Sequence, residues 1–173
     1  GRIVYQSLVR INVAIEEDTL KNNKTINEAI AHANNNNGKV HVLGLVSDGG
    51  VHSHSDHIIA LDKIIKSLGG KSYVHAYTDG RDVDPVSATK FVGELVENGA
   101  DVVSISGRYY SMDRDKKFDR TMLSYNASVY NEGPSYTNVL DYIKSEAEAG
   151  RNDEFILPAY DSTKNIKIEP GDA

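Results

Sequence analysis

The residues with the clearest chemical potential are two arginines in one short segment, Ser106 to Asp115. Arg108 and Arg114 follow an apolar run, Val102 to Ile105, that predicts a buried strand, and they precede a helical stripe that begins at Phe118. A guanidinium group is always charged and binds a carboxylate or a phosphate through two parallel hydrogen bonds. The start of a helix adds free backbone N–H groups. The segment therefore predicts a site for a small anion.

Two further polar loops follow predicted strands in the same way. Buried-strand patterns cover residues 39–46 and 72–78, and each runs directly into its loop. A histidine after two glycines favours contact with a ligand, and an Asp beside an Arg stays ionised near neutral pH and can accept a proton from a hydroxyl. The candidate residues of these loops are His52, His54, Arg81 and Asp82.

The alternation of strands and helices predicts an α/β fold, a three-layer α/β/α sandwich with a mostly parallel sheet. Ligands of such sheets bind beyond the carboxyl ends of the strands, so all three loops are expected at one edge. Helices are predicted over residues 3–17, 56–68 and 136–149. Three more are predicted from their first residues: one begins with a capping box at Thr25 and Glu28, one follows an N-cap at Ser87, and one begins at Phe118 with Met122 and Tyr125 on the same face. Weaker patterns suggest strands over 155–157 and 164–168.

Length and composition limit the classes of protein. The 173 residues suffice for one domain with a real core, and a formal net charge of -6 argues against a nucleic-acid-binding face. No apolar run is long enough to span a membrane, and there are no cysteines, which excludes disulfides and zinc–thiolate sites and fits a reducing cytoplasm. The first residue is not methionine and the last ones form a turn, so we expect a piece of a longer protein.

Other interpretations of the same residues stay open. The spacing of His52 and His54 also occurs in metal-dependent hydrolases, although a loop histidine such as His54 often only binds backbone. Asp79 and Gly80 suit an ordinary turn. The charged residues from Asp113 to Asp119 suit a solvated helix start, within which Arg120 forms an ion pair. A third alternative is an anion-binding module that catalyses nothing.

Three long motifs resemble one known family. Gly44 to His54, Thr78 to Asp82 and Ser106 to Asp115 are similar to cofactor-independent phosphoglycerate mutases, in the same order along the chain. The opening residues Gly1 to Gln6 and the segment Asp153 to Pro158 resemble the same family. The resemblance covers essentially the whole chain.

The resemblance implies an architecture of two domains. One domain is phosphatase-like and carries two manganese ions and a serine nucleophile, and the other is inserted into it and holds the glycerate. Residues 1–173 resemble the inserted, substrate-binding domain alone. The family's serine, its manganese ligands and a further arginine motif are expected outside this chain, so no metal is expected here and the chain alone is expected to be inactive.

The resemblance also implies a reaction and a set of contacts. The family interconverts 3-phosphoglycerate and 2-phosphoglycerate in glycolysis and gluconeogenesis through a phosphoserine intermediate. Implied partners are these two substrates and the phosphatase-like domain of the same chain, without nucleic acid or membrane, in the cytoplasm. Asp82 is implied to exchange the proton of the reacting hydroxyl. Substrate contact is implied for His52, Arg81, Asp82, Arg108 and Arg114.

Overall fold

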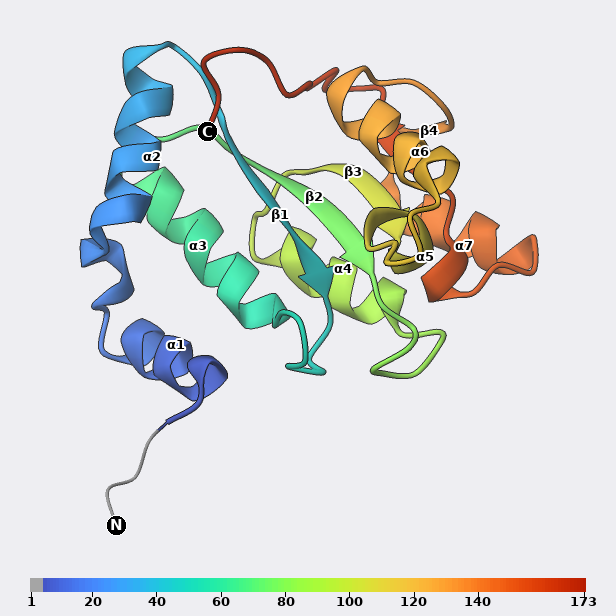
Figure 1. Cartoon of the computed structure of the whole chain (residues 1–173), viewed down its shortest axis with the longest axis horizontal. Coiled ribbons are helices and arrows are strands. Elements are labelled where there is room, and N and C mark those ends of the chain that lie inside the picture. The colour runs from blue at the N-terminus through green and yellow to red at the C-terminus, as the bar shows by residue number, and fades with distance from the viewer. Residues whose placement is uncertain (1–4) are drawn as a thin grey trace.

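The computed structural model describes residues 5–173, in which helices surround a central sheet (Figure 1). The strands are β1 (Val40–Val46), β2 (Ser72–Thr78), β3 (Val102–Gly107), β4 (Ser135–Tyr136) and β5 (Ala159–Asp161). The α-helices are α1 (Ser7–Glu16), α2 (Lys24–Asn35), α3 (Ser55–Ser67), α4 (Ala88–Glu97), α5 (Arg108–Ser111), α6 (Phe118–Val129) and α7 (Val139–Glu148). Two short 3-10 helices are η1 (Leu20–Asn22) and η2 (Asp153–Phe155).

The sheet has the order β1-β2-β3-β5-β4, and its first three strands are parallel. Strand β5 runs antiparallel to β3 and parallel to β4. Helices α3 and α4 cover the face that carries Val74, whereas α6 covers the opposite face, where Ser128 lies 3.4 Å from Ser104 of β3. The predicted α/β sandwich with a mostly parallel sheet is confirmed. Its parallel order also brings the loops after β1, β2 and β3 to one edge.

The central strands are buried, although β2 and β3 carry His75 and Ser104 among their apolar residues. Val74, Ala76 and Ile105 are fully buried, and they pack with Ile65 of α3 and Leu95 of α4. Strands covered on both faces have no solvent side that would require alternating polar residues. The predicted strand over residues 72–78 therefore matches β2 at both ends.

Several predicted helix details are wrong. The first helix begins at Ser7, and residues 3 and 4 of the predicted range lie outside the described residues. Asn23, rather than the predicted box at Thr25 and Glu28, caps α2, because its side chain accepts a hydrogen bond from the N–H of Ile26. The apolar residues that begin α6, namely Phe118, Met122 and Tyr125, are exposed, whereas Ser124, Ala127 and Ser128 face inward.

Both weak strand predictions near the carboxyl end are also wrong. Residues 153–155 form η2, the chain then runs extended, and the strand proper is Ala159–Asp161. Residues 164–168 form a turn and an irregular segment, without a strand. The short strands β4 and β5 depend on pairing with each other and with β3, which local alternation does not reveal.

A buried chain of polar side chains fastens the last residues to the sheet. Nε2 of His41 lies 2.9 Å from Asp172, Nδ1 of His41 lies 2.8 Å from Nε2 of His75, and Nδ1 of His75 lies 2.7 Å from the hydroxyl of Ser104. If both imidazole rings are neutral, every hydrogen-bond donor in this row of side chains meets an acceptor. The backbone of Ala173 also pairs with Lys39 and His41 beside β1, near the C-terminus marked in Figure 1.

The buried histidine predicts a loss of stability in acid. Burial, reinforced by His41, lowers the pKa of His75 from 6.5 to about 3. Between these two values the unfolded chain binds a proton at this residue that the folded chain does not, so the free energy of unfolding falls as the pH falls. We expect urea unfolding from pH 7 to pH 4 to show this decrease, and His75→Gln to reduce its slope. An unchanged slope in the variant would assign the acid sensitivity to other groups.

Candidate anion-binding site

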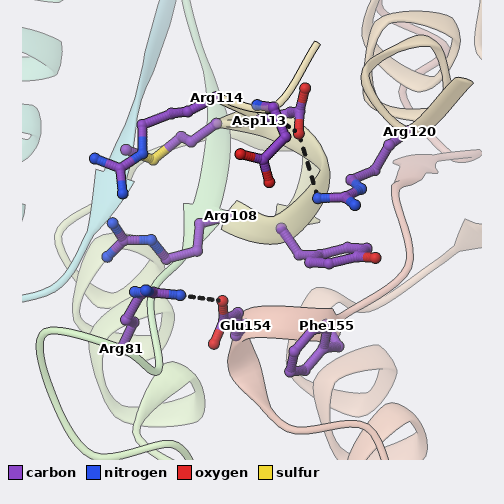
Figure 2. A pocket seen from close by; sticks show the side chains of 10 residues that line it. Arg81, Arg108, Asp113, Arg114, Arg120, Glu154 and Phe155 are labelled. Atoms are coloured by element: carbon purple, nitrogen blue, oxygen red, sulfur yellow. Dashed lines mark hydrogen bonds and ion pairs between the residues drawn. The ribbon is translucent and has the colours of Figure 1, made fainter. Parts of the chain in front are cut away.

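The site is a cleft of about 440 Å³ at the carboxyl edge of the sheet. Its walls come from the loop after β2, from α5 and the loop behind it, from the start of α6, and from η2. The side chains of Arg81, Arg108, Arg114 and Arg120 lie around this cleft (Figure 2). The lining residues are Arg81, Arg108, Tyr109, Met112, Asp113, Arg114, Asp115, Arg120, Glu154 and Phe155.

One buried carboxylate joins all three loops. Oδ2 of Asp79 accepts a hydrogen bond of 2.7 Å from Ser47, which follows β1. Oδ1 accepts from the backbone N–H groups of Arg81 and Asp82, at 3.1 and 3.0 Å, in the loop after β2. The same oxygen accepts a hydrogen bond of 2.6 Å from Nη1 of Arg108, directly after β3. Asp79 therefore fixes the loops relative to one another.

The hydrogen bonds keep Asp79 ionised in spite of its burial. Burial alone would raise the pKa of Asp79, but the N–H of Asp82, the hydroxyl of Ser47, the Arg108 guanidinium and the N–H of Arg81 outweigh it. The pKa therefore lies below the ordinary aspartate value. Both oxygens of Asp79 are occupied by donors, so this carboxylate is a structural anion rather than a base.

Arg108 is held by two carboxylates through the same nitrogen. Its Nη1 lies 2.6 Å from Asp79 and 2.7 Å from Oδ2 of Asp82. Burial opposes the charge of Arg108, but Asp82 and Asp79 more than compensate, and the pKa of the guanidinium lies above its ordinary value. Nε and Nη2 make no hydrogen bond with residues 5–173, which leaves the other edge of the fork for a ligand.

Two glycines allow the η2 segment to pack against these loops. A Cβ on Gly107 would lie 2.3 Å from the backbone oxygen of Glu154, and one on Gly80, whose φ is +68°, would lie 2.9 Å from the Glu154 nitrogen. This close approach places Glu154 3.2 Å from Nη1 of Arg81.

The same packing lets Asp153 accept hydrogen bonds of 2.7 Å from the N–H groups of Ser87 and Ala88 at the start of α4. The predicted side-chain cap by Ser87 is thus wrong: Asp153 caps the helix instead.

The predicted arginines do come together. In Figure 2 the guanidinium groups of Arg81, Arg108 and Arg114 point toward the same side of the cleft. Arg81 is exposed and pairs with Glu154, whereas no ion pair is found for Arg114 within residues 5–173. Arg114 is therefore the guanidinium with the fewest internal contacts to lose when an anion enters.

The two histidines of the first loop have different surroundings. Nε2 of His52 lies 3.9 Å from Oδ2 of Asp82, and the His52 side chain is 41% exposed, but neither residue is among those that line the cleft. Nδ1 of His54 accepts the N–H of Asp56 and caps α3, which confirms the backbone-binding interpretation of His54. Among residues 5–173, no three His, Cys, Asp or Glu side chains converge on a common metal position.

The opposite wall of the cleft is an ion pair that sequence patterns misplaced. Asp113, predicted to be solvated, has a side chain only 3% exposed and lies 3.2 Å from Nη1 of Arg120. The Arg120 guanidinium also lies over the ring of Tyr109, at 3.7 Å from its centroid. The predicted pairing of Arg120 is confirmed, but the pair is largely buried in the wall of the cleft, whereas a solvated surface was predicted.

Sequence reasoning missed four residues that shape the site. Asp79 was assigned to an ordinary turn, and Ser47, Glu154 and Asp113 received no role. Asp79 and Ser47 act through bonds between separate loops, which residue spacing does not encode. All four residues lie within segments that carry the family resemblance, and this was the available signal.

Comparisons with known proteins point to one family. Residues 11–173 match the sequence model of a family described as the N-terminus of BPG-independent PGAM. The chain is 44% identical to the 2,3-bisphosphoglycerate-independent phosphoglycerate mutase of Acholeplasma laidlawii, and 43% identical to that of Staphylococcus aureus strain COL. Both alignments cover 100% of this chain, with 34% and 35% of the relatives. A crystal structure of Leishmania mexicana phosphoglycerate mutase at low cobalt concentration superposes with a TM-score of 0.86 and 27% identity, over 100% of this chain and 35% of that one.

The chain belongs to the family of 2,3-bisphosphoglycerate-independent phosphoglycerate mutases. It spans about a third of the length of the curated relatives it matches. None of the helices in residues 5–173 has the length and hydrophobicity that a membrane span requires.

The two ion pairs of the cleft should differ in their contribution to stability. Arg120→Ala leaves the buried carboxylate of Asp113 without its cation, and we expect a loss of about 1–3 kcal/mol. Arg81→Ala breaks an exposed pair, worth about 0–1 kcal/mol. Urea unfolding of both variants measures the difference. Equal effects would contradict the structural role of the Arg120 wall.

Proposed function

We propose that this chain is the substrate-binding domain of a larger two-domain phosphoglycerate mutase, and that its cleft binds phosphoglycerate. The observation that carries the proposal is the convergence of Arg81, Arg108 and Arg114 on one side of a cleft at the carboxyl edge of a parallel sheet. The family membership supports the choice of anion. Carboxylate and phosphate are the groups that guanidinium forks bind best.

Each arginine enters the complex differently. Arg108 offers its free edge without leaving Asp79 and Asp82, so its position is set before the ligand arrives. Arg81 exchanges its exposed contact with Glu154 for the ligand, at little cost in free energy. Arg114 adds a cation from the loop behind α5. Fixed and exchangeable contacts together hold an anion while allowing the molecule between the charges to turn.

We further propose that Asp82 exchanges the proton of the reacting hydroxyl. Its side chain is 21% exposed, accepts a hydrogen bond from Arg108 and lies 3.9 Å from Nε2 of His52. The exposed part of this carboxylate is open to a substrate hydroxyl, as a general base must be. His52 would orient Asp82 or contact the substrate directly.

The remaining chemistry belongs outside these residues. Family resemblance implies a serine nucleophile and two manganese ions, which would accept and stabilise the transferred phosphoryl group. Among the described side chains, no cluster of three His, Cys, Asp or Glu fits such an ion. Holding glycerate matters because its release would turn a mutase into a phosphatase.

Replacing the arginines by lysine tests the proposed binding. Arg108→Lys and Arg114→Lys keep the charge but lose the fork. Loss of one hydrogen bond to a charged group costs roughly 1.5–3 kcal/mol, so we expect 3-phosphoglycerate to bind about tenfold to a hundredfold more weakly in calorimetric titration. Arg10→Lys, on the exposed surface of α1, is the matched control and should bind like the original chain. Unchanged affinity in both cleft variants at unchanged melting temperature would remove the arginines from the site.

The chain alone should bind substrate without converting it. We expect no 2-phosphoglycerate to form in an enolase-coupled assay with manganese, because the implied nucleophile lies elsewhere. The Staphylococcus aureus relative serves as the positive control. Turnover by the purified chain would overturn the proposed division of labour and favour a complete active site within residues 1–173.

A further inference from the structure

We propose that Asp79 is the positioning residue of the anion site, which fixes the Arg108 guanidinium while Asp82 gains and loses a proton. The inference rests on the proposed function of the cleft and goes beyond it by giving the two carboxylates at Arg108 different tasks. It starts from their shared contact: both bind the same nitrogen, Nη1, at 2.6 and 2.7 Å.

The surroundings of the two carboxylates separate their tasks. The Asp79 side chain is 1% exposed, and its oxygens accept four hydrogen bonds, from Ser47, Arg81, Asp82 and Arg108. A reacting hydroxyl cannot reach so deeply buried a carboxylate. Asp82 is 21% exposed and uses one oxygen for Arg108, so a substrate proton can reach it.

Proton transfer explains why two carboxylates are needed. When the substrate hydroxyl takes the phosphoryl group from the implied serine, the electron pair of its O–H bond is freed for the new O–P bond, and the pair of the broken serine O–P bond stays on the serine oxygen. The proton passes to Asp82, whose carboxylate becomes a neutral acid. Its attraction for Arg108 then weakens at the moment when the ligand's charge must stay in place. Asp79 keeps its charge, because its donors hold its pKa low, and Arg108 therefore stays where it was. A displacement of about 1 Å at this stage can cost a hundredfold in rate.

The sign of one mutational effect distinguishes positioning from simple electrostatics. Asp79→Asn removes a negative charge next to an anion site. If Asp79 acted only through its charge, its removal would strengthen the binding of 3-phosphoglycerate. If Asp79 positions Arg108, the dissociation constant should instead rise about tenfold, as expected for the loss of one charge-assisted hydrogen bond. Equal or tighter binding by folded Asp79→Asn overturns the proposal.

A double-mutant cycle shows whether the effect passes through Arg108. In an Arg108→Ala background, Asp79→Asn should have almost no further effect on binding. Additive losses would mean that Asp79 supports the loops in general. Asp62→Asn, which neutralises a buried carboxylate that pairs with Lys66 on α3, is the matched control and should leave binding unchanged.

A measurement without ligand separates this proposal from the proposed function. A guanidinium held at Nη1 rotates slowly about its C–N bonds, so the Nη atoms of Arg108 should give separate ¹⁵N resonances. These should merge in Asp79→Asn and stay separate in Asp82→Asn. Separate resonances in Asp79→Asn overturn the inference even if phosphoglycerate binds, whereas failure of the original chain to bind phosphoglycerate refutes only the function. If Asp79→Asn does not fold, Ser47→Ala, which loosens Asp79, should weaken binding two- to fivefold, and unchanged affinity there overturns the proposal.

Discussion

The carboxylate of Asp79 is the contact on which the geometry of the site depends. Three parallel strands deliver three loops to one edge, but parallel pairing alone leaves the loops free to splay. One buried anion receives a hydroxyl from the first loop, two backbone N–H groups from the second and a guanidinium from the third. Breaking such a set leaves unpaired buried groups, which is more costly than any single bond is stabilising.

The cleft is not a simple positive patch. Its arginines are balanced by acidic side chains, since Arg108 meets two aspartates, Arg81 meets Glu154 and Arg120 meets Asp113. On a chain with a net charge of -6, this balance keeps the arginines ordered without attracting polyanions. The paired groups differ in burial, so the cleft combines fixed cations with exchangeable ones. Affinity for a small anion then arises from preorganisation more than from total charge.

The sequence was sufficient to predict the layers of the fold and the convergence of the arginines at one edge of the sheet. Buried strands such as residues 72–78 contain enough apolar and aromatic residues to be recognised, although polar residues lie among them. The rule for parallel sheets then places the loops that follow these strands. The C-terminal strands were mispredicted because β4 and β5 have two and three residues and exist only through pairing with distant partners. The predicted cap of α4 was wrong for the same reason, since Asp153 lies 66 residues away in sequence from Ser87, whose N–H it accepts.

The residues at the site also differ in whether the sequence alone could predict their roles. Arg81, Arg108 and Arg114 could be predicted to lie together because they are charged and follow predicted strands, and all three line the cleft. Asp79 was read as half of an Asp-Gly turn, and that interpretation is locally sound, because Gly80 has a positive φ. The turn also directs two backbone N–H groups at Oδ1 of Asp79. Asp79 therefore both forms the turn and joins the three loops. For a buried aspartate at the end of a parallel strand, the donors at its four acceptor positions must therefore be identified before the residue is assigned to a turn alone.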